Sequence, residues 1–458
     1  MDEKEPQLPE KFKSRIEKQL GPEAPSFFQS FYEEPHRALR INPLKCDDPA
    51  SLLDYLGLDP AKQVPWEPNG YEYEEELAPG KHPLHAAGAY YIQEPSAMLP
   101  VSMLRPAKED RVLDLCASPG GKTTQLAAYM ENRGLLIANE IHPARARILS
   151  ENVERMGLKN CIVLNEKPEA LAKRFPGFFT KILVDAPCSG EGMFRRNYTA
   201  IEEWEKGDRN SECQERQKLV LKYSAQMLQE GGILCYSTCT FAEEENEIVV
   251  KDFLEQHHDF HFGNIRRIWP HRDPGEGHFS CLLYRDKTNF GGQIFSSNLP
   301  KLNHNISDFS KSDHSLQKFS KSNPILTQFF EDLFSDSNLL PARFIAYGDT
   351  FYLLPEGAPK LDGLRALRPG LCLGTIKKGS SNSTFLPSHA LALSLSPDQV
   401  KRSLSLSLEE ARRYLHGEAL PTQGSPGWTL VHLNGYSLGF GKVSNGMLKN
   451  HYPKGLRV

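Results

Sequence analysis

Apolar runs of strand length alternate with amphipathic segments of helix length through the middle of this chain, from Arg111 to about Arg285. Such an alternation predicts βα units, in which each helix returns the chain to begin the next strand in the same direction. The pattern therefore predicts an α/β fold with a doubly wound, Rossmann-like parallel sheet that binds ligands at the carboxyl ends of its strands. The expected strands span residues 112–117, 135–140, 161–165, 182–186 and 233–238.

The 458 residues are too many for a single core and predict about three domains. We expect a small N-terminal accessory domain over residues 1–100 and the α/β core over 101–287. Residues 288–325 are rich in Ser, Asn and Lys and contain Phe-Ser-Lys-Ser twice, which is typical of a linker. Short apolar runs bounded by Gly and Pro predict an α+β, β-rich region over 326–458, which can also be divided into two lobes near residue 400.

Composition excludes several classes of protein. No apolar run approaches the ~20 residues that a membrane helix needs, and the acidic N-terminus lacks the apolar stretch of a secretion signal. Nine cysteines contain no C-x-x-C pair of the kind that zinc or a redox switch requires. We therefore expect a cytoplasmic protein with free thiols, no metal and no membrane partner.

Local charge points to a nucleic-acid partner. The net charge is −4, yet residues 401–458 carry eight Lys or Arg against three Asp or Glu. Aromatic and basic residues interleave there, from Phe440 and Lys442 to Tyr452 and Lys454. Interleaving of this kind suits stacking on bases with phosphate contacts, although the solvated surface of a β-domain can have the same composition.

A glycine turn follows the first expected strand, where backbone can approach a ligand. A P-loop would require glycine at Cys116, and the dinucleotide fingerprint fails because the only glycines are adjacent. Glu140 ends the second strand, where a carboxylate can bind a ribose; taken alone, it could equally be a solvated acid. Turn and acid together predict an adenosine-type ligand without a required pyrophosphate. The turn comprises Cys116, Ala117, Ser118, Pro119, Gly120, Gly121 and Lys122.

Two later strands are each followed by a cysteine, Cys188 in Asp-Ala-Pro-Cys-Ser-Gly and Cys239 in Ser-Thr-Cys-Thr. Carboxyl ends of parallel strands meet at one edge of a sheet, so both thiols should lie at the ligand-binding edge. A free cysteine is more often a small buried apolar residue. We expect that fate for Cys161, Cys235 and Cys281.

These three motifs, Cys-Ala-Ser-Pro-Gly-Gly-Lys, Asp-Ala-Pro-Cys-Ser-Gly and Ser-Thr-Cys-Thr, resemble in order and spacing the RNA cytosine-5 methyltransferases of the Sun (Fmu) family, which use S-adenosylmethionine. Further matches lie at residues 82–83, 90–97, 269–271 and 275–279. With the basic tail they resemble the bacterial RsmF type, which modifies 16S ribosomal RNA. The resemblance covers most of the chain, most clearly residues 90–285.

The resemblance implies roles for the cofactor residues. Residues 116–122 would cradle the methionine part of S-adenosylmethionine and Glu140 would bind its ribose. Many relatives carry an aspartate near the adenine after the third strand, where this chain has Lys167 at the expected spacing. Asn165 or Glu166 is expected to replace it. The C-terminal region resembles PUA-like RNA-binding modules.

The resemblance also implies a covalent mechanism, because carbon 5 of cytosine becomes nucleophilic only after a thiolate adds to carbon 6. DNA cytosine-5 enzymes use the cysteine that corresponds to Cys188, so counting alone leaves either thiol open. The RNA family favours Cys239 as the nucleophile and Cys188 as the residue that assists product release. It places Asp185 between the cofactor and the substrate base, as a cofactor-binding residue and the contact to the base.

The partner implied is RNA, with 16S rRNA or the small ribosomal subunit as the substrate and a monomeric enzyme as the expected state. The target cytosine should be flipped out or unpaired. Arg37, Arg40 and Lys45 of the N-terminal domain are expected to hold the surrounding RNA. A transfer-RNA substrate would use the same motifs, and a non-catalytic ribosome assembly factor could keep the same fold.

Overall fold

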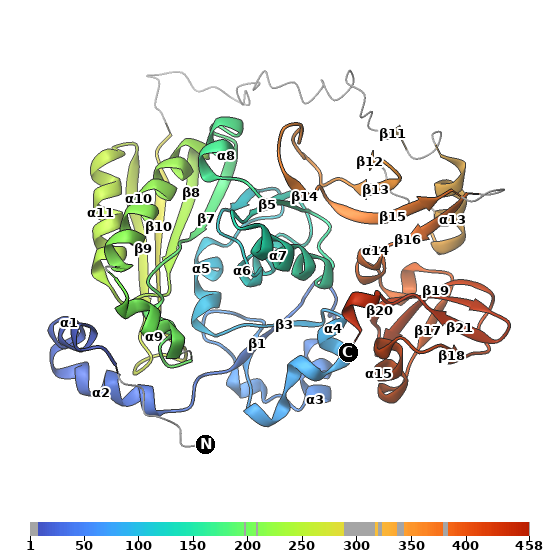
Figure 1. Cartoon of the computed structure of the whole chain (residues 1–458), viewed down its shortest axis with the longest axis horizontal. Coiled ribbons are helices and arrows are strands. Elements are labelled where there is room, and N and C mark those ends of the chain that lie inside the picture. The colour runs from blue at the N-terminus through green and yellow to red at the C-terminus, as the bar shows by residue number, and fades with distance from the viewer. Residues whose placement is uncertain are drawn as a thin grey trace.

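The computed structural model describes residues 8–196, 198–207, 209–287, 317–318, 323–336, 343–378 and 383–457. Its centre is an eight-stranded sheet in the order β14-β6-β5-β4-β7-β8-β10-β9 (Figure 1). The five strands from β6 to β8 in this order run parallel, and β10 lies antiparallel between β8 and β9. The bounds are β4 Arg111–Asp114, β5 Leu135–Asn139, β6 Cys161–Leu164, β7 Phe179–Asp185, β8 Leu228–Thr238, β9 Phe260–Ile268, β10 His278–Arg285 and β14 Ala366–Arg368.

Helices cover both faces of this sheet. Val112 and Leu136 face one layer, whereas their neighbours Leu113 and Ile137 face the other, because successive strand side chains alternate. The first layer holds α5 Leu99–Leu104, α6 Gly121–Tyr129 and α7 Pro143–Arg155; the second holds α8 Pro168–Arg174, α10 Arg209–Met227 and α11 Glu247–Gln256. The predicted doubly wound α/β core is confirmed, with the difference that the sheet is mixed.

The N-terminal region has a three-stranded antiparallel sheet, in the order β2-β1-β3. Its first two helices leave this sheet and pack with α9 and the loops beyond β7 and β8, through Phe12, Phe27, Phe194 and Phe241. The bounds are α1 Glu10–Leu20, α2 Ala24–Gln29, β1 Ala38–Ile41, α3 Pro49–Leu56, β2 Gly70–Glu72, α4 Pro83–Ala86, β3 Tyr90–Ile92 and α9 Tyr198–Glu205.

The C-terminal region has two five-stranded sheets, β11-β12-β13-β15-β16 and β17-β19-β20-β21-β18. The bounds are β11 Gln317–Lys318, α13 Pro324–Leu333, β12 Arg343–Tyr347, β13 Thr350–Leu353, β15 Leu371–Lys377, β16 Thr384–Pro387, α14 His389–Leu393, β17 Ser403–Ser405, α15 Leu408–His416, β18 Leu420–Pro421, β19 Gly427–Leu433, β20 Tyr436–Ser444 and β21 Met447–Asn450. Among the described residues no helix is long and apolar enough to cross a membrane.

Boundaries between the regions are less simple than expected. β14 comes from the C-terminal region but pairs with β6 at the edge of the central sheet. β11 and the start of α13 fall inside the expected linker; both Phe-Ser-Lys-Ser copies, at 309–312 and 319–322, lie outside the described residues. Leu52 and Leu53 of α3 share one apolar core with Tyr414 and Leu433 of the C-terminal region.

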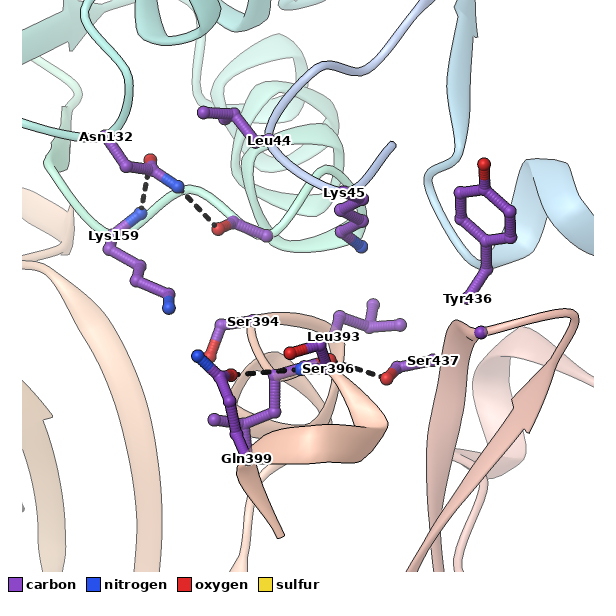
Figure 2. A pocket seen from close by; sticks show the side chains of 13 residues that line it. Leu44, Lys45, Asn132, Lys159, Leu393, Ser394, Ser396, Gln399, Tyr436 and Ser437 are labelled. Atoms are coloured by element: carbon purple, nitrogen blue, oxygen red, sulfur yellow. Dashed lines mark hydrogen bonds between the residues drawn. The ribbon is translucent and has the colours of Figure 1, made fainter. Parts of the chain in front are cut away.

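Lys45 lies at the junction of all three regions, beside a pocket of about 100 Å3 (Figure 2). Its Nζ donates to Ala87 O at 2.6 Å and to Arg155 O at 3.0 Å. Arg155 ends α7, so the Lys45 amine donates to the carboxyl end of this helix, and burial lowers the pKa of Lys45 well below its ordinary value. The prediction that Lys45 holds RNA is therefore wrong.

Arg40 is likewise buried, with 1% of its surface exposed. Its guanidinium donates to Thr124 Oγ1 at 2.7 Å, to Gly121 O at 3.0 Å and to Gln93 Oε1 at 3.2 Å. The prediction that it binds RNA is wrong, because a buried guanidinium must use its donors on nearby acceptors. Arg37 is at the surface, where it pairs with Glu34 and Glu75.

Arg40→Ala should lower the free energy of unfolding by about 3 kcal/mol, because it leaves buried acceptors unsatisfied. Arg37→Ala, which breaks only exposed ion pairs, should cost less than about 1 kcal/mol. Urea unfolding of both variants measures the difference. Equal stability of the two, with RNA affinity lost in Arg40→Ala, would restore the RNA-binding role of Arg40.

Candidate active site

The two cysteines lie side by side because β7 and β8 are adjacent parallel strands, with Asp185 opposite Ser237. Both strands end at the same edge of the sheet. The loops that follow them turn toward each other, so that Cys188 Sγ lies 3.2 Å from Cys239 Sγ. The Cys239 N–H also donates to Cys188 Sγ at 3.4 Å. The structure thus brings together the two thiols that the sequence singled out.

Short polar contacts join the two cysteine loops. Gly192 N donates to Cys239 O at 2.8 Å, and the Ser189 and Thr240 hydroxyls lie 2.8 Å apart. A Cβ on Gly192 would meet Cys239 O at 2.8 Å and Gly277 O at 2.9 Å, so a side chain at this position would separate the loops. The relative position of the two thiols is therefore restricted by backbone contacts.

Asp185 lies at the end of β7 between two basic groups. Its Oδ2 accepts a hydrogen bond from Lys122 Nζ at 2.8 Å, and its Oδ1 accepts one from Ser237 Oγ at 2.9 Å. His278 Nε2 lies 3.6 Å from Oδ1. Burial alone would raise the pKa of Asp185, but Lys122 and His278 outweigh it and hold this pKa well below its usual range.

The pKa of Lys122 is shifted in the opposite direction from that of Asp185. Burial acts to lower its pKa, but the charge and hydrogen bond of Asp185 raise it above the ordinary value. Burial lowers the pKa of His278. The site thus holds an ionised carboxylate paired with a protonated lysine. His278 was matched in the sequence only as part of a motif; its position beside Asp185 was not anticipated.

The glycine turn connects β4 to α6. Gly120 has a φ of 116°, in the left-handed region, and a Cβ on Gly121 would lie 3.2 Å from the Tyr91 ring. Ala117 N donates to Asn139 O at 2.9 Å, Ser118 Oγ to Arg145 O at 2.9 Å, and Asn152 Nδ2 to Pro119 O at 2.9 Å. Cys116 is half-buried, and burial raises the pKa of its thiol.

Asp114, which sequence reasoning missed, lies below this turn at the end of β4. It is fully buried; its Oδ2 accepts a hydrogen bond from Thr123 Oγ1 at 2.6 Å, whereas its Oδ1 has no partner among the described residues. Burial raises its pKa to about 7. A buried acid in an otherwise apolar strand was the available signal.

Glu140 lies one residue beyond β5, with its side chain 4% exposed. Its Oε1 accepts from His142 N at 2.9 Å, and its Oε2 lies 3.5 Å from Arg145. The carboxylate is therefore held at the carboxyl edge by the start of α7.

Asn165 and Glu166, beyond β6, bind protein groups. Asn165 Nδ2 donates to Glu140 O at 2.7 Å, and Glu166 Oε1 accepts from Arg365 N at 2.7 Å. Arg365 precedes β14, so the C-terminal region reaches the expected adenine end of the site, a feature without a sequence signal. Lys167 caps the start of α8 with its backbone.

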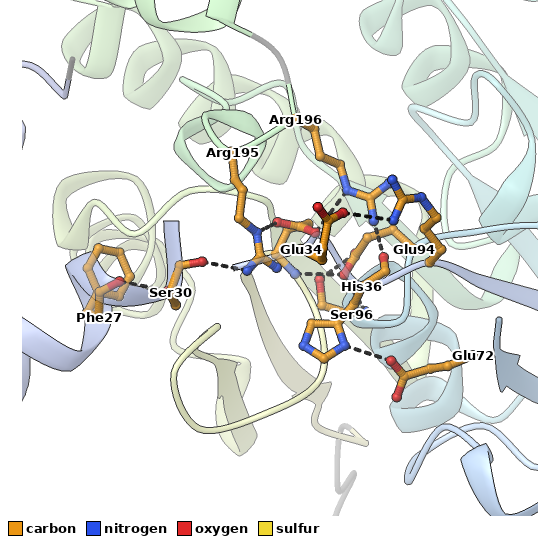
Figure 3. Close-up of polar contacts among 11 residues, drawn as sticks. Phe27, Ser30, Glu34, His36, Glu72, Glu94, Ser96, Arg195 and Arg196 are labelled. Atoms are coloured by element: carbon orange, nitrogen blue, oxygen red, sulfur yellow. Dashed lines mark hydrogen bonds and ion pairs between the residues drawn. The ribbon is translucent and has the colours of Figure 1, made fainter. Parts of the chain in front are cut away.

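Arg195 and Arg196 fasten the Cys188 loop to the N-terminal region (Figure 3). Their Nε atoms lie 2.5 and 3.0 Å from the two carboxylate oxygens of Glu276. Arg195 also donates to Ser30 O at 2.7 Å, and Arg196 donates to His36 O. The N-terminal region is thereby tied to the carboxyl edge of the sheet.

A doubly wound sheet with a glycine turn after its first strand and reactive side chains at its carboxyl edge defines a Rossmann-like methyltransferase. Residues 101–284 match the family described as 16S rRNA methyltransferase RsmB/F. Residues 8–95, 328–395 and 401–458 match the RsmF N-terminal, first C-terminal and PUA domains.

Two curated relatives are named ribosomal RNA small subunit methyltransferase F. The Vibrio cholerae protein is 30% identical over 98% of this chain and 97% of its own, and the Psychromonas ingrahamii protein is 30% identical over 92% and 90%. The chain belongs to the RsmF family of 16S rRNA methyltransferases, and it is an RNA methyltransferase with a PUA domain.

Solved structures agree with this fold. A methyltransferase homolog from Pyrococcus horikoshii aligns with a TM-score of 0.53 and 28% identity over 61% of this chain and 96% of its own. NSun6 from the same organism aligns with a TM-score of 0.53 over 61% of this chain and 98% of its own; at 21% identity it supports the fold alone.

Asp114 should make stability depend on pH. Its pKa in the folded protein, about 7, exceeds the ordinary value of 3.8, so its contribution is lost as pH rises through 7. The free energy of unfolding of Asp114→Asn, relative to that of the wild type, should therefore rise by about 2–3 kcal/mol between pH 5 and pH 8. Urea unfolding of both proteins at the two pH values measures this difference. A difference between Asp114→Asn and the wild type that does not change with pH would contradict the raised pKa of Asp114.

Proposed function

We propose that this enzyme transfers a methyl group from S-adenosylmethionine to carbon 5 of cytosine in 16S rRNA, through a covalent adduct at carbon 6. The observation that carries the proposal is the pair of thiols 3.2 Å apart, at the carboxyl edge where Asp185 also lies. Methyl transfer to an oxygen or an exocyclic nitrogen needs no thiol. Addition to a pyrimidine ring needs a nucleophile that can also leave, which a thiolate provides.

The cofactor proposed is S-adenosylmethionine, and the site fits it. Gly120 and Gly121 leave their part of the turn free of side chains, and Glu140 offers a carboxylate to ribose hydroxyls. Asp114 Oδ1 is a buried oxygen that has no partner among the described residues and suits a cationic ligand. When bound, the cofactor supplies an electrophilic methyl group. The P. horikoshii NSun6 structure, which shares the fold, holds SFG, an analogue of this cofactor.

The remaining cofactor residues are proposed with more limited roles. Cys116 to Lys122 provide backbone around the methionine part of the cofactor. Asn165 and Glu166 border its adenine end together with Arg365. Asn165 Nδ2 and Glu166 Oε1 already bind protein groups, and Asn165 or Glu166 remains the proposed replacement for the aspartate of relatives.

Cys239 is proposed as the nucleophile and Cys188 as the residue that assists release. Two thiolates at 3.2 Å would repel each other, so only one of the pair ionises readily. The contact with Cys239 and burial raise the pKa of Cys188. Cys188 therefore keeps its proton while Cys239 adds to carbon 6. Once the Cys239 sulfur is bonded to carbon 6, its charge no longer opposes ionisation of Cys188, which loses its proton to solvent. After methyl transfer the Cys188 thiolate accepts the carbon 5 proton, the C5–C6 double bond re-forms, and the bond from carbon 6 to sulfur breaks to release the Cys239 thiolate.

Asp185 is proposed to select cytosine. Because Lys122 keeps it ionised, its carboxylate accepts hydrogen bonds. Cytosine offers an exocyclic amine, and its ring nitrogen N3 becomes a donor once protonated in the adduct. Uracil has a carbonyl in place of the amine, which an ionised carboxylate would repel. Lys122 supplies the compensating positive charge.

RNA outside the target nucleotide is proposed to contact the PUA domain. Lys442 and Lys449 are opposite each other on β20 and β21, and Lys442 Nζ lies 5.8 Å from the centre of the Trp428 ring. These cations would bind phosphates and position the RNA without reading its sequence. The target cytosine must be unpaired or flipped, since stacking hides carbon 6.

Trapping with 5-fluorocytosine RNA tests the chemistry, because fluorine at carbon 5 blocks release of the adduct. The wild type and Cys188→Ala should each form a complex that resists denaturing gels, and Cys239→Ala should form none. An adduct in Cys239→Ala would contradict the assignment of the nucleophile.

Labelled cofactor tests the substrate. Intact small subunits or free 16S rRNA should accept label, and bisulfite sequencing should place it on cytosine. Label on transfer RNA instead would show that the substrate is transfer RNA. Label on no RNA would favour a non-catalytic ribosome assembly factor.

A further inference from the structure

Two buried carboxylates near the thiols have no part in the reaction described above. Glu191 belongs to the loop that carries Cys188, yet its Oε2 accepts a hydrogen bond from Phe241 N, beyond Cys239, at 3.1 Å. Glu245 follows the Cys239 loop, yet its Oε2 accepts one from Ser189 N, next to Cys188, at 2.9 Å. Each cysteine loop thus sends a carboxylate to the backbone of the other.

Helix α10 holds this reciprocal pair from the side. Asn210 Nδ2 donates to Glu191 Oε1 at 3.2 Å and to Glu245 Oε1 at 3.0 Å. Gln217 Nε2 donates to Glu245 Oε2 and to Pro187 O, both at 2.9 Å. Gln217 therefore holds the peptide group before Cys188 and Glu245 holds the one after it, and these two side chains are hydrogen-bonded to each other.

Of the two carboxylates, Glu191 has a cationic partner and Glu245 does not, among the described residues. Glu191 Oε2 lies 2.6 Å from Arg15 Nη2 of α1, so the N-terminal region supplies its cation. Among the described residues no basic side chain lies within ion-pair distance of Glu245. Burial raises the pKa of Glu245 to about 7, and the charge of Glu191 adds to this.

We propose that Glu191 and Glu245 are positioning residues that set the two thiols separately: Glu191 holds the loop of Cys239, and Glu245 holds the loop of Cys188. The inference rests on the proposed function, because it assigns the two thiols to different steps. It follows that Glu191 affects formation of the covalent adduct, whereas Glu245 affects release of the product. A carboxylate that served only general stability would affect both halves equally.

Glutamine substitutions isolate the effect, because glutamine keeps the shape but has only one acceptor oxygen. In Glu245→Gln the amide NH2 must face at least one of three donors, Ser189 N, Asn210 Nδ2 and Gln217 Nε2, so the Cys188 loop shifts. In Glu191→Gln the same conflict arises at Phe241 N or at its other donors, so the Cys239 loop shifts.

The experiment measures adduct formation and product release separately on the full-length protein. Rates of adduct formation are measured with 5-fluorocytosine RNA, and rates of product release are measured with unmodified 16S rRNA in single turnover. Glu245→Gln should keep adduct formation within about twofold, slow release at least tenfold and accumulate the covalent complex. Glu191→Gln should slow adduct formation at least tenfold, with any adduct released normally. The exposed glutamates Glu244 and Glu202 provide matched controls as Glu244→Gln and Glu202→Gln, which should leave both rates unchanged.

Equal loss of both rates in either variant would overturn the proposal, as would unchanged rates. If a glutamine variant does not fold, Glu245→Asp or Glu191→Asp keeps the charge and withdraws the carboxylate, and the same separation of the two rates is expected. Failure of the proposed function is distinguishable, because the wild type itself would then form no adduct with 5-fluorocytosine RNA.

Discussion

The parallel pairing of β7 with β8, with Asp185 opposite Ser237, is the constraint on which the active site depends. Both strands end at the same edge of the sheet, β7 three residues before Cys188 and β8 one residue before Cys239. A shift of one residue in this register would turn Ser237 away from Asp185 and separate the sulfurs. The thiol pair and the Asp185 site are therefore products of one strand pairing.

The N-terminal region completes this edge of the sheet. Arg40 holds the first turn of α6 through Gly121 O and Thr124, next to the proposed cofactor site. Arg195 and Arg196 tie the Cys188 loop to Ser30 and His36. The region predicted as an RNA-binding accessory thus contributes the buried Arg40 and the backbone acceptors of Ser30 and His36 to the structure of this edge.

Sequence reasoning reached the parts of the fold that periodicity and turn chemistry encode. The five core strands agree to within a few residues, since apolar runs bounded by turns leave little choice, and the two strand-end cysteines come together in space. Arg40 was misread because a basic residue suggests RNA and because its alternation with Leu39 and Ile41 in a strand favours an exposed position, yet all four residues of β1 are buried.

Other features have no local signal. β14 joins a strand some 200 residues earlier in the chain, a pairing that only the assembled sheet specifies. Glu243, Glu244 and Glu245 look like one solvated acidic run, yet only the last is buried. Long-range contacts decide such positions.

Peptide mapping of the complex trapped on 5-fluorocytosine RNA tests the central claim most directly. Trypsin separates the two thiols, with Cys188 in peptide 182–195 and Cys239 in peptide 223–251. Fragmentation by mass spectrometry should locate the nucleotide on Cys239. A nucleotide on Cys188 would contradict the account of which thiol attacks.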